Sequence, residues 1–140
     1  MVQVINDLAS APECQEPLRA EIESVIEKFG GWTKQALTAM KKLDSVLRES
    51  QRLNGLALFT GLHKAMVPHT FSDGTFVPKG SWVATPATAV HQDADLYENA
   101  TEFDGFRFSR VREQPDQGTK HQMVSVTGDY LAFGLGRHAW

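Results

Sequence analysis

Apolar residues in the first 55 positions recur with the spacing of an α-helix. From Pro17 onward, one stripe of apolar side chains repeats at intervals of three and four residues: Leu18, Ile22, Val25, Ile26 and Phe29. That spacing is typical of an amphipathic helix that buries one face. Pro17 predicts a kink or a start of this helix, because proline lacks the backbone N–H that a running helix needs, and Gly30-Gly31 predicts its end. Apolar residues within 2–8 indicate another short helix.

A second apolar face begins near Thr33, whose hydroxyl can cap a helix start. Its members share one side of a single helix: Ala36, Met40, Leu43, Leu47 and Ser50. Asn54-Gly55 predicts the end of that helix. We therefore expect one continuous helix over 33–54, packed against the helix before it and against a small sheet.

After Gly55 the pattern changes to short apolar runs separated by prolines and glycines. It predicts strands near 64–67, 70–72, 75–77 and 81–85. The Asp73-Gly74 pair predicts a hairpin between the second and third strands, because it accepts the positive φ of a tight turn. A short helix can start in "TPATAV", and 91–128 is predicted to be mostly loop. So long a loop is uncommon in a compact domain, and it indicates either a functional loop or a piece of something larger.

Together these elements predict a mixed α+β fold that is mainly helical. We expect one partial domain over 1–140, helical over 1–55 and built of strands and loops over 56–140. At 140 residues the chain is long enough for one domain and too short for two ordinary ones.

Composition narrows the possible partners. The residues are 41% hydrophobic and 22% charged, and the net charge is -3, so the basic excess of a nucleic-acid-binding surface is missing. No run approaches the roughly 18 apolar residues of a membrane span, and no signal peptide is visible. The single cysteine, Cys14, cannot form an intrachain disulfide, which favours an intracellular setting.

Glu49 and Arg52 lie three residues apart on the predicted second helix. On spacing alone, a surface ion pair is the more common interpretation. The alternative is a buried pair that clamps a distant segment, because the planar arginine fork can bind a carboxylate and backbone carbonyls together. A clamp needs a third partner, and Arg107 in "FDGFRF" is the candidate, since the phenylalanines around it can bury its stem.

Two further motifs carry polar groups at short spacing. His91, Asp93 and Asp95 in "HQDAD" could bind a divalent metal, although a turn capped by aspartate is the more common use of such spacing. In "FGLGRHA", two glycines permit a close backbone approach to a flat or bulky ligand, and Arg137 and His138 supply hydrogen-bond donors. An ordinary glycine-rich turn is the equally supported alternative. Cys14 has no histidine near it in sequence and is a poor candidate nucleophile.

Taken in order, the three motifs Glu-x-x-Arg, Phe-x-x-x-Arg-Phe and Phe-Gly-x-Gly-Arg-His resemble those of the cytochromes P450, the haem-thiolate monooxygenases, and most of all their fungal members. The resemblance covers essentially the whole chain and is to the C-terminal part of the family's fold. "DLASAPECQEPLRAEIE" is similar to the J helix, and "KLDSVLRESQRLNG" to the K helix. "FSDGTFVPKGSWVATPATAVHQDADLY" is similar to the β-hairpin and the segment after it.

The resemblance implies a role for each of these motifs. Glu49, Arg52 and Arg107 would form a buried structural triad that fixes the loop behind the haem. Phe133, Gly134 and Gly136 would shape the turn that faces the haem. His138 and His63 would bind its propionates, and Arg137 would also belong to the cofactor site. Leu58 and Phe59 would border the substrate pocket. For intact family members it also implies a lipophilic small-molecule substrate, an NADPH-dependent reductase and an anchor in the endoplasmic reticulum membrane.

The sequence departs from the family pattern where the chemistry is decided. The haem-ligating cysteine is expected two residues after His138, and that position is Trp140. The thiolate is what favours O–O cleavage in this family, and an indole nitrogen has no usable lone pair to replace it. Neither the anchor nor the oxygen-activating acid/threonine helix of the family is found here. We therefore expect this chain alone to be inactive, with no catalytic residue and no metal ligand. The alternatives are a non-catalytic truncated or mis-spliced remnant and a small α+β binding module.

Overall fold

The computed structural model describes residues 2–55, 58–137 and 139. It confirms the mixed, mainly helical fold: helices dominate the first part of the chain, and short strands follow them. The first part contains α1 (Val2–Ser10), a 3-10 turn η1 (Pro12–Cys14), α2 (Gln15–Phe29), α3 (Lys34–Ala39) and α4 (Lys41–Leu53). The second contains β1 (Thr60–Lys64), β2 (His69–Thr70), β3 (Phe76–Val77), β4 (Trp82–Thr85), α5 (Ala87–His91) and α6 (Arg107–Arg112).

Helix α2 begins and ends as its sequence predicts. It begins at Gln15, so Pro17 lies in the first turn, where its missing N–H costs no helical hydrogen bond. Gly30 follows the last turn in the left-handed conformation, with φ of 68°, and the Gly31 N–H donates to the Ile26 carbonyl at 3.0 Å. This is the glycine-terminated helix end that the sequence indicated.

The prediction of one helix over 33–54 is wrong, because Met40 interrupts it. Thr33 does cap a helix, accepting a hydrogen bond from the Ala36 N–H at 3.1 Å, but that helix is the short α3. Met40 has a non-helical ψ of 75°, and α4 begins after it. The Glu21 carboxylate on α2 accepts bonds from the Lys42 N–H at 2.9 Å and the Leu43 N–H at 3.0 Å. A side chain from a distant element therefore caps the new helix start.

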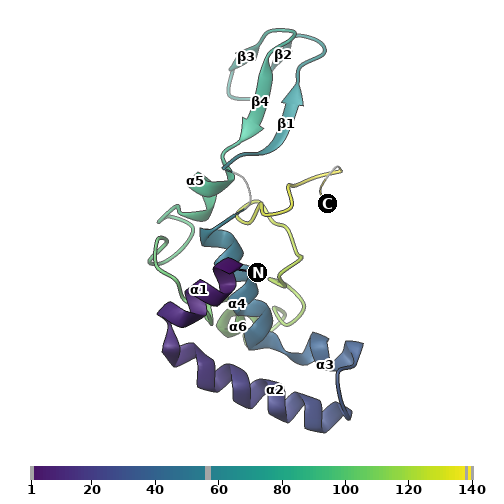
Figure 1. Cartoon of the computed structure of the whole chain (residues 1–140). Coiled ribbons are helices and arrows are strands. Elements are labelled where there is room, and N and C mark those ends of the chain that lie inside the picture. The colour runs from purple at the N-terminus through teal and green to yellow at the C-terminus, as the bar shows by residue number, and fades with distance from the viewer. Residues whose placement is uncertain (1, 56–57, 138, 140) are drawn as a thin grey trace.

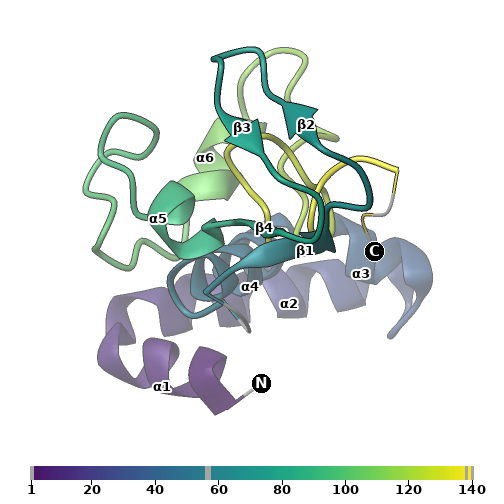
Figure 2. The same ribbon diagram turned by 90° about the horizontal axis from the view of Figure 1, so that it is seen from above.

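Helix α4 is the centre of the molecule. It contacts α1, α2, α5 and α6, and the ribbon views show these helices arranged around it (Figures 1 and 2). One small core, on the α2 side, is formed by Ala11, Cys14, Leu18 and Val46. A second is formed by Tyr97, Ala100, Phe108 and Tyr130. The two cores lie on different faces of α4, so this helix connects the N-terminal helices to the C-terminal loops.

The strands form two small antiparallel sheets. β1 pairs with β4, with His63 opposite Val83, and β2 pairs with β3, with His69 opposite Val77. The hairpin at Asp73-Gly74 is confirmed: Gly74 has a φ of 88°, and the Phe71 N–H donates to the Thr75 carbonyl at 2.9 Å. The first strand lies at Thr60–Lys64, earlier than the predicted 64–67. In Figure 1 the two sheets extend away from the helical part of the molecule.

The long segment after α5 contains one helix that the sequence did not predict. α6 has no capping side chain at its own N-terminus. Instead, the Ser45 hydroxyl on α4 accepts hydrogen bonds from the Phe108 N–H at 3.1 Å and the Ser109 N–H at 3.0 Å. The short α5 in "TPATAV" is where the sequence predicted a helix start. Around α6 the chain runs as turns and loops.

Candidate functional site

A charged cluster lies at the centre of the molecule. Arg52 binds Glu49 through two hydrogen bonds of 2.8 Å, from Nε to Oε2 and from Nη2 to Oε1, and both side chains are completely buried. This is the bidentate geometry that the arginine fork favours. The pair is therefore buried and is not a surface ion pair, and its geometry is the one that the clamp interpretation requires.

Arg107 is the third member of the cluster, although it lies 58 positions from Glu49 in the sequence. Its Nε donates to Glu49 Oε1 at 3.1 Å, and its side chain is 13% exposed. The Asp104 N–H donates to the same carboxylate oxygen at 3.2 Å. One buried carboxylate thus meets two guanidinium groups and a backbone amide. That arrangement satisfies a buried negative charge.

The arginines also bind backbone carbonyls of the loop segments. Arg52 donates to the carbonyls of His91, Ala100 (2.5 Å) and Glu102 (3.3 Å). Arg107 donates to the Glu98 carbonyl at 2.6 Å and the Asn99 carbonyl at 3.4 Å. Buried loop carbonyls need donors that a helix or sheet would otherwise supply. The cluster supplies them and so holds a segment with little secondary structure of its own.

Arg48 is a second arginine that clamps loop carbonyls, and the sequence motifs did not predict it. It is completely buried on α4 and donates to the carbonyls of Gln122 and Ser125 (2.7 Å). Its guanidinium lies 3.5 Å from the Tyr130 ring centre and 4.7 Å from that of Phe108, both within the range of cation–π contacts. Burial lowers the pKa of Arg48 from its usual value, and the nearby tyrosines, Asp129 and Asp44 act in the opposite direction. The sequence offered one signal for this role: Arg48 lies next to Glu49 on the same helix, four positions before Arg52, and all three are buried.

The C-terminal segment passes along α4 before it reaches the glycine loop, which we define as residues 131–137. The Tyr130 hydroxyl donates to Gln51 Oε1 at 2.8 Å, and the Tyr97 hydroxyl donates to the Asp129 carbonyl at 2.7 Å. Burial raises the pKa of Tyr97 to about 12, and it also raises the pKa of Tyr130. Both side chains are therefore neutral hydroxyls that can donate these hydrogen bonds. The segment is therefore fixed up to the first residue of the loop.

Within the glycine loop, both glycines adopt backbone conformations that other residues rarely take. Gly134 has a φ of 80° and Gly136 a φ of 87°. The Gly134 N–H donates to the Leu131 carbonyl at 2.9 Å, and the Ala139 N–H donates to the Gly136 carbonyl at 3.0 Å. Phe133 is half-buried and Arg137 is exposed. His138 and Trp140 lie outside the described residues.

The remaining predicted site residues lie in and just before the first sheet. His63 is exposed on β1, beside an apolar groove of about 390 Å³ that includes Met66, Phe71 and Val83. Leu58 and Phe59 precede β1 and are 68% and 59% exposed. The structure therefore brings together the triad and places the glycine loop, but leaves these three side chains exposed.

The "HQDAD" motif forms a turn. The Asp95 N–H donates to Asp93 Oδ1 at 2.9 Å, and both aspartates are exposed. The His91 ring instead binds the Leu131 N–H. No group of three or more metal-binding side chains occurs among the residues that the structure describes. Cys14 is buried beside Gly105 and Val46, and burial raises the pKa of its thiol above 9.0. It therefore remains protonated within the first small core.

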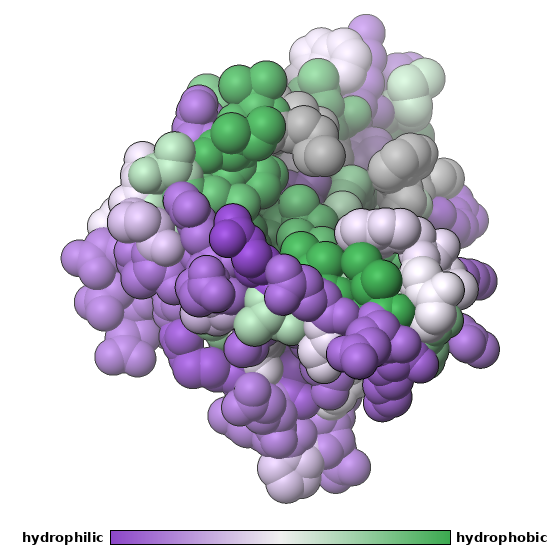
Figure 3. Space-filling view, turned by 60° about the horizontal axis from the view of Figure 1, so that its bottom comes forward, coloured by the Kyte–Doolittle hydropathy of each residue, from purple (hydrophilic) through white to green (hydrophobic). Residues whose placement is uncertain are grey.

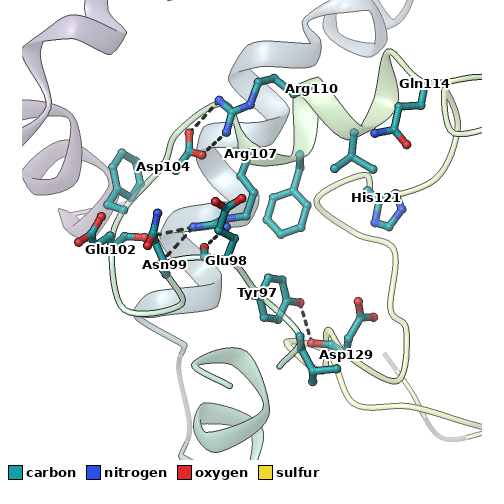
Figure 4. Close-up of a pocket in the computed structure, with 14 residues that line it drawn as sticks. Tyr97, Glu98, Asn99, Glu102, Asp104, Arg107, Arg110, Gln114, His121 and Asp129 are labelled. Atoms are coloured by element: carbon teal, nitrogen blue, oxygen red, sulfur yellow. Dashed lines mark hydrogen bonds and ion pairs between the residues drawn. The ribbon is translucent and has the colours of Figure 1, made fainter. Parts of the chain in front are cut away.

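A cavity lies beside the charged cluster (Figure 4). It has a volume of about 700 Å³, and its lining includes Arg107, Asp104, Arg110, His121 and Asp129. Figure 4 shows that Arg110 turns to Asp104 while Arg107 turns to the carbonyls of Glu98 and Asn99. Arg110 and Arg107 at its rim are thus bound by Asp104 and by backbone carbonyls, so both arginines take part in the packing of the loop.

Comparison with known proteins gives a consistent result. The family model described as cytochrome P450 matches residues 3–139. The chain is 46% identical over 132 residues to cytochrome P450 monooxygenase 151 of Postia placenta, covering 94% of this chain and 26% of that protein. It is 48% identical over 136 residues to cytochrome P450 monooxygenase hepE of Aspergillus oryzae, covering 97% of this chain and 24% of that protein. The chain thus spans about a quarter of the length of these relatives.

The fold has a counterpart among solved structures. A zebrafish cytochrome P450, determined with abiraterone, superposes with a TM-score of 0.78 at 24% identity. The match covers 99% of this chain and 30% of that one. At this identity the likeness concerns the fold alone, and it shows that the arrangement of helices and small sheets described above is the one found in that larger protein.

Proposed function

The chain belongs to the cytochrome P450 family, and we propose that it forms the haem-facing C-terminal portion of a monooxygenase that oxidises a lipophilic small molecule with dioxygen. The observation that carries this proposal is the buried cluster of Glu49, Arg52 and Arg107, followed in the chain by the glycine loop. Relatives at 41–48% identity are named as monooxygenases of this family. In the intact protein, electrons would come from an NADPH-dependent reductase.

The proposed roles of individual residues follow from their positions. The triad binds the carbonyls of the segment between α5 and α6, so its role is structural. Gly134 and Gly136 bend the loop through positive φ, which lets the backbone approach a flat ligand, and Phe133 offers an aromatic wall. Arg137, His138 and His63 would bind haem propionates, and Leu58 and Phe59 would contact the substrate.

The side chains present suit the propionate groups of a haem, but they do not supply the family's iron ligand. Exposed Arg137 and His63 suit carboxylates. The family's haem chemistry depends on a cysteine thiolate. The only cysteine in the sequence is Cys14, which is buried in the first core, and position 140 is a tryptophan. An indole N–H has no lone pair to offer a metal. The residues present therefore do not complete a haem-thiolate centre, and no reaction step is assigned to this chain.

We infer that the chain as it stands is inactive as a monooxygenase, and that a non-catalytic remnant is the second candidate. A carbon-monoxide difference spectrum of the purified, haem-supplemented chain tests this. We expect no thiolate-type Soret band from the wild type. The Trp140→Cys variant is the matched comparison, because it places a thiol at the position where the family motif expects one. A thiolate-type band from the wild type would refute inactivity.

If the Trp140→Cys variant gains that band, the glycine loop is shaped as proposed and the tryptophan alone prevents ligation. If neither protein gives the band while a compact fold is retained, the chain behaves as a small α+β module, and the haem-facing role is contradicted.

Location in the cell is a further proposal. In the part of the chain that the structure describes, every helix is too short or too polar to cross a bilayer. From the family resemblance, and not from this absence, we propose that the intact protein lies inside the cell and is anchored to the endoplasmic reticulum membrane.

A further inference from the structure

His91 links the charged cluster to the glycine loop through two different groups. Its carbonyl accepts a hydrogen bond from the Arg52 guanidinium. Its ring Nε2 accepts a hydrogen bond of 2.8 Å from the Leu131 N–H, and Leu131 is the first residue of the glycine loop. The side chain is only 2% exposed, so neither bond competes with water.

The ring is also held in place by stacking. It lies parallel to the Tyr130 ring, with centroids 5.2 Å apart and an interplanar angle of 20°. Tyr130 is in turn fixed by Gln51 and by the Arg48 guanidinium on α4. The ring is therefore held by Tyr130, which groups on α4 hold in turn, with Nε2 facing the Leu131 N–H.

We propose that His91 is the positioning residue that sets the start of the glycine loop, with its ring as a neutral acceptor for the Leu131 N–H. This inference rests on the proposed function in one respect: a loop that faces haem needs its first residue held in a fixed position. The bond itself is a property of the chain alone. His91 would affect a reaction at the haem only indirectly, through the position of the glycine loop.

The acceptor exists only while the ring is neutral. A ring that accepts at Nε2 carries its proton at Nδ1, and a protonated ring has two donors and no acceptor. Four ionisable groups surround the ring: Arg52 and Arg48 from α4, and Asp129 and Tyr130 from the C-terminal segment. Burial lowers the pKa of His91 below its usual value, and the charges of Arg52 and Arg48 act in the same direction. A hydrogen bond of the ring to the Arg52 backbone and the charge of Asp129 act in the opposite direction.

Two variants separate the acceptor from the packing. His91→Phe keeps a flat ring to stack on Tyr130 but has no acceptor. His91→Gln loses the ring but can place an amide oxygen where Nε2 lies, since its side chain reaches the same distance. A residue needed only to fill space would tolerate His91→Phe better than His91→Gln. A positioning residue would show the opposite order.

The test uses nuclear magnetic resonance on the full 140-residue chain without haem. In the wild type at about pH 7, where the ring is neutral, we expect a scalar coupling across the hydrogen bond between the Leu131 amide nitrogen and His91 Nε2. We expect Leu131 amide exchange to be roughly tenfold faster in His91→Phe, the effect of losing one buried hydrogen bond, and nearly unchanged in His91→Gln. As pH falls through the folded-state pKa of His91, wild type should lose its protection relative to His91→Gln.

Either of two results overturns the proposal: no coupling in the folded wild type, or equal Leu131 exchange in wild type and His91→Phe. If His91→Phe does not fold, the coupling and the comparison with His91→Gln still decide it. Neither readout involves haem, so an absent Soret band in the Trp140→Cys variant would contradict the proposed function while leaving the role of His91 standing.

Discussion

Glu49 is the residue on which most of the buried charge depends. Its carboxylate accepts from Arg52, from Arg107 and from the Asp104 backbone N–H. A buried ion pair adds little stability compared with well-packed apolar groups, but removal of one partner leaves the other charges uncompensated. Two guanidinium groups and one amide share a single carboxylate here, so its loss is felt by three partners at once.

We therefore expect Glu49→Gln to lower the free energy of unfolding by about 3–5 kcal/mol, since the amide keeps the shape and removes the charge. Urea denaturation followed by circular dichroism measures this. Glu16→Gln is the matched control, because Glu16 faces Arg19 at 3.9 Å with 83% of its side chain exposed. The control should change stability by less than about 1 kcal/mol. Equal effects of the two changes would show that the buried triad is not a stabilising unit.

At the scale of elements, two helices owe their starts to side chains far away in the sequence. Glu21 on α2 caps α4, and Ser45 on α4 caps α6. The free backbone N–H groups of a helix start need an acceptor, and local residues usually provide it. Because these caps come from other elements, α4 and α6 form only when the helices pack together. Their formation is thus coupled to tertiary structure.

This coupling predicts that Glu21→Ala destabilises the chain by about 1–2 kcal/mol, the usual effect of losing a helix cap. Hydrogen exchange at the Lys42 and Leu43 amides should accelerate, since these amides lose their acceptor. Glu23→Ala is the control, because Glu23 is exposed on the same helix. If the two variants have the same stability and the same exchange at Lys42, the cap contributes nothing.

At the scale of the whole molecule, apolar surface gathers outside the two cores. Many large hydrophobic side chains of the strand region are exposed, among them Leu62 (64%), Met66 (72%) and Trp82 (64%). Figure 3 shows hydrophobic surface gathered into patches beside hydrophilic side chains on one face of the molecule. A further apolar groove lies among the helices, where Leu8, Ile22 and Leu43 line it. Apolar patches of this kind favour association.

We expect the purified chain to self-associate, and Leu62→Ser with Met66→Ser to weaken that association by at least about tenfold. Each large apolar side chain that is buried in a contact is worth about 1.5–3 kcal/mol, and 1.4 kcal/mol corresponds to tenfold in affinity. Sedimentation velocity over a concentration series measures this. Val124→Ser is the control, because Val124 is equally exposed but lies outside the strand region. A wild type that stays monomeric at every concentration contradicts the prediction.

The local sequence predicted the features that depend on neighbouring residues. The end of α2 at Gly30, the Thr33 cap and the Asp73-Gly74 hairpin occur as expected, because glycine conformations, caps and tight turns are decided within a few positions. The family motifs pointed to Glu49, Arg52 and Arg107, and the fold brings these three side chains together, because Glu49 and Arg52 lie on adjacent turns of one helix and Arg107 pairs with the same carboxylate.

Tertiary structure decided the rest, since it depends on groups that meet only after folding. The break at Met40, the existence of α6, the burial of Arg48 and the bond from Leu131 to His91 all involve partners at least 20 positions apart. The sequence by itself determined the family, the turns and the identity of Trp140. Only packing around α4 determined which carbonyls the arginines bind and how the glycine loop begins, because a buried polar group takes its role from the partner that folding brings to it.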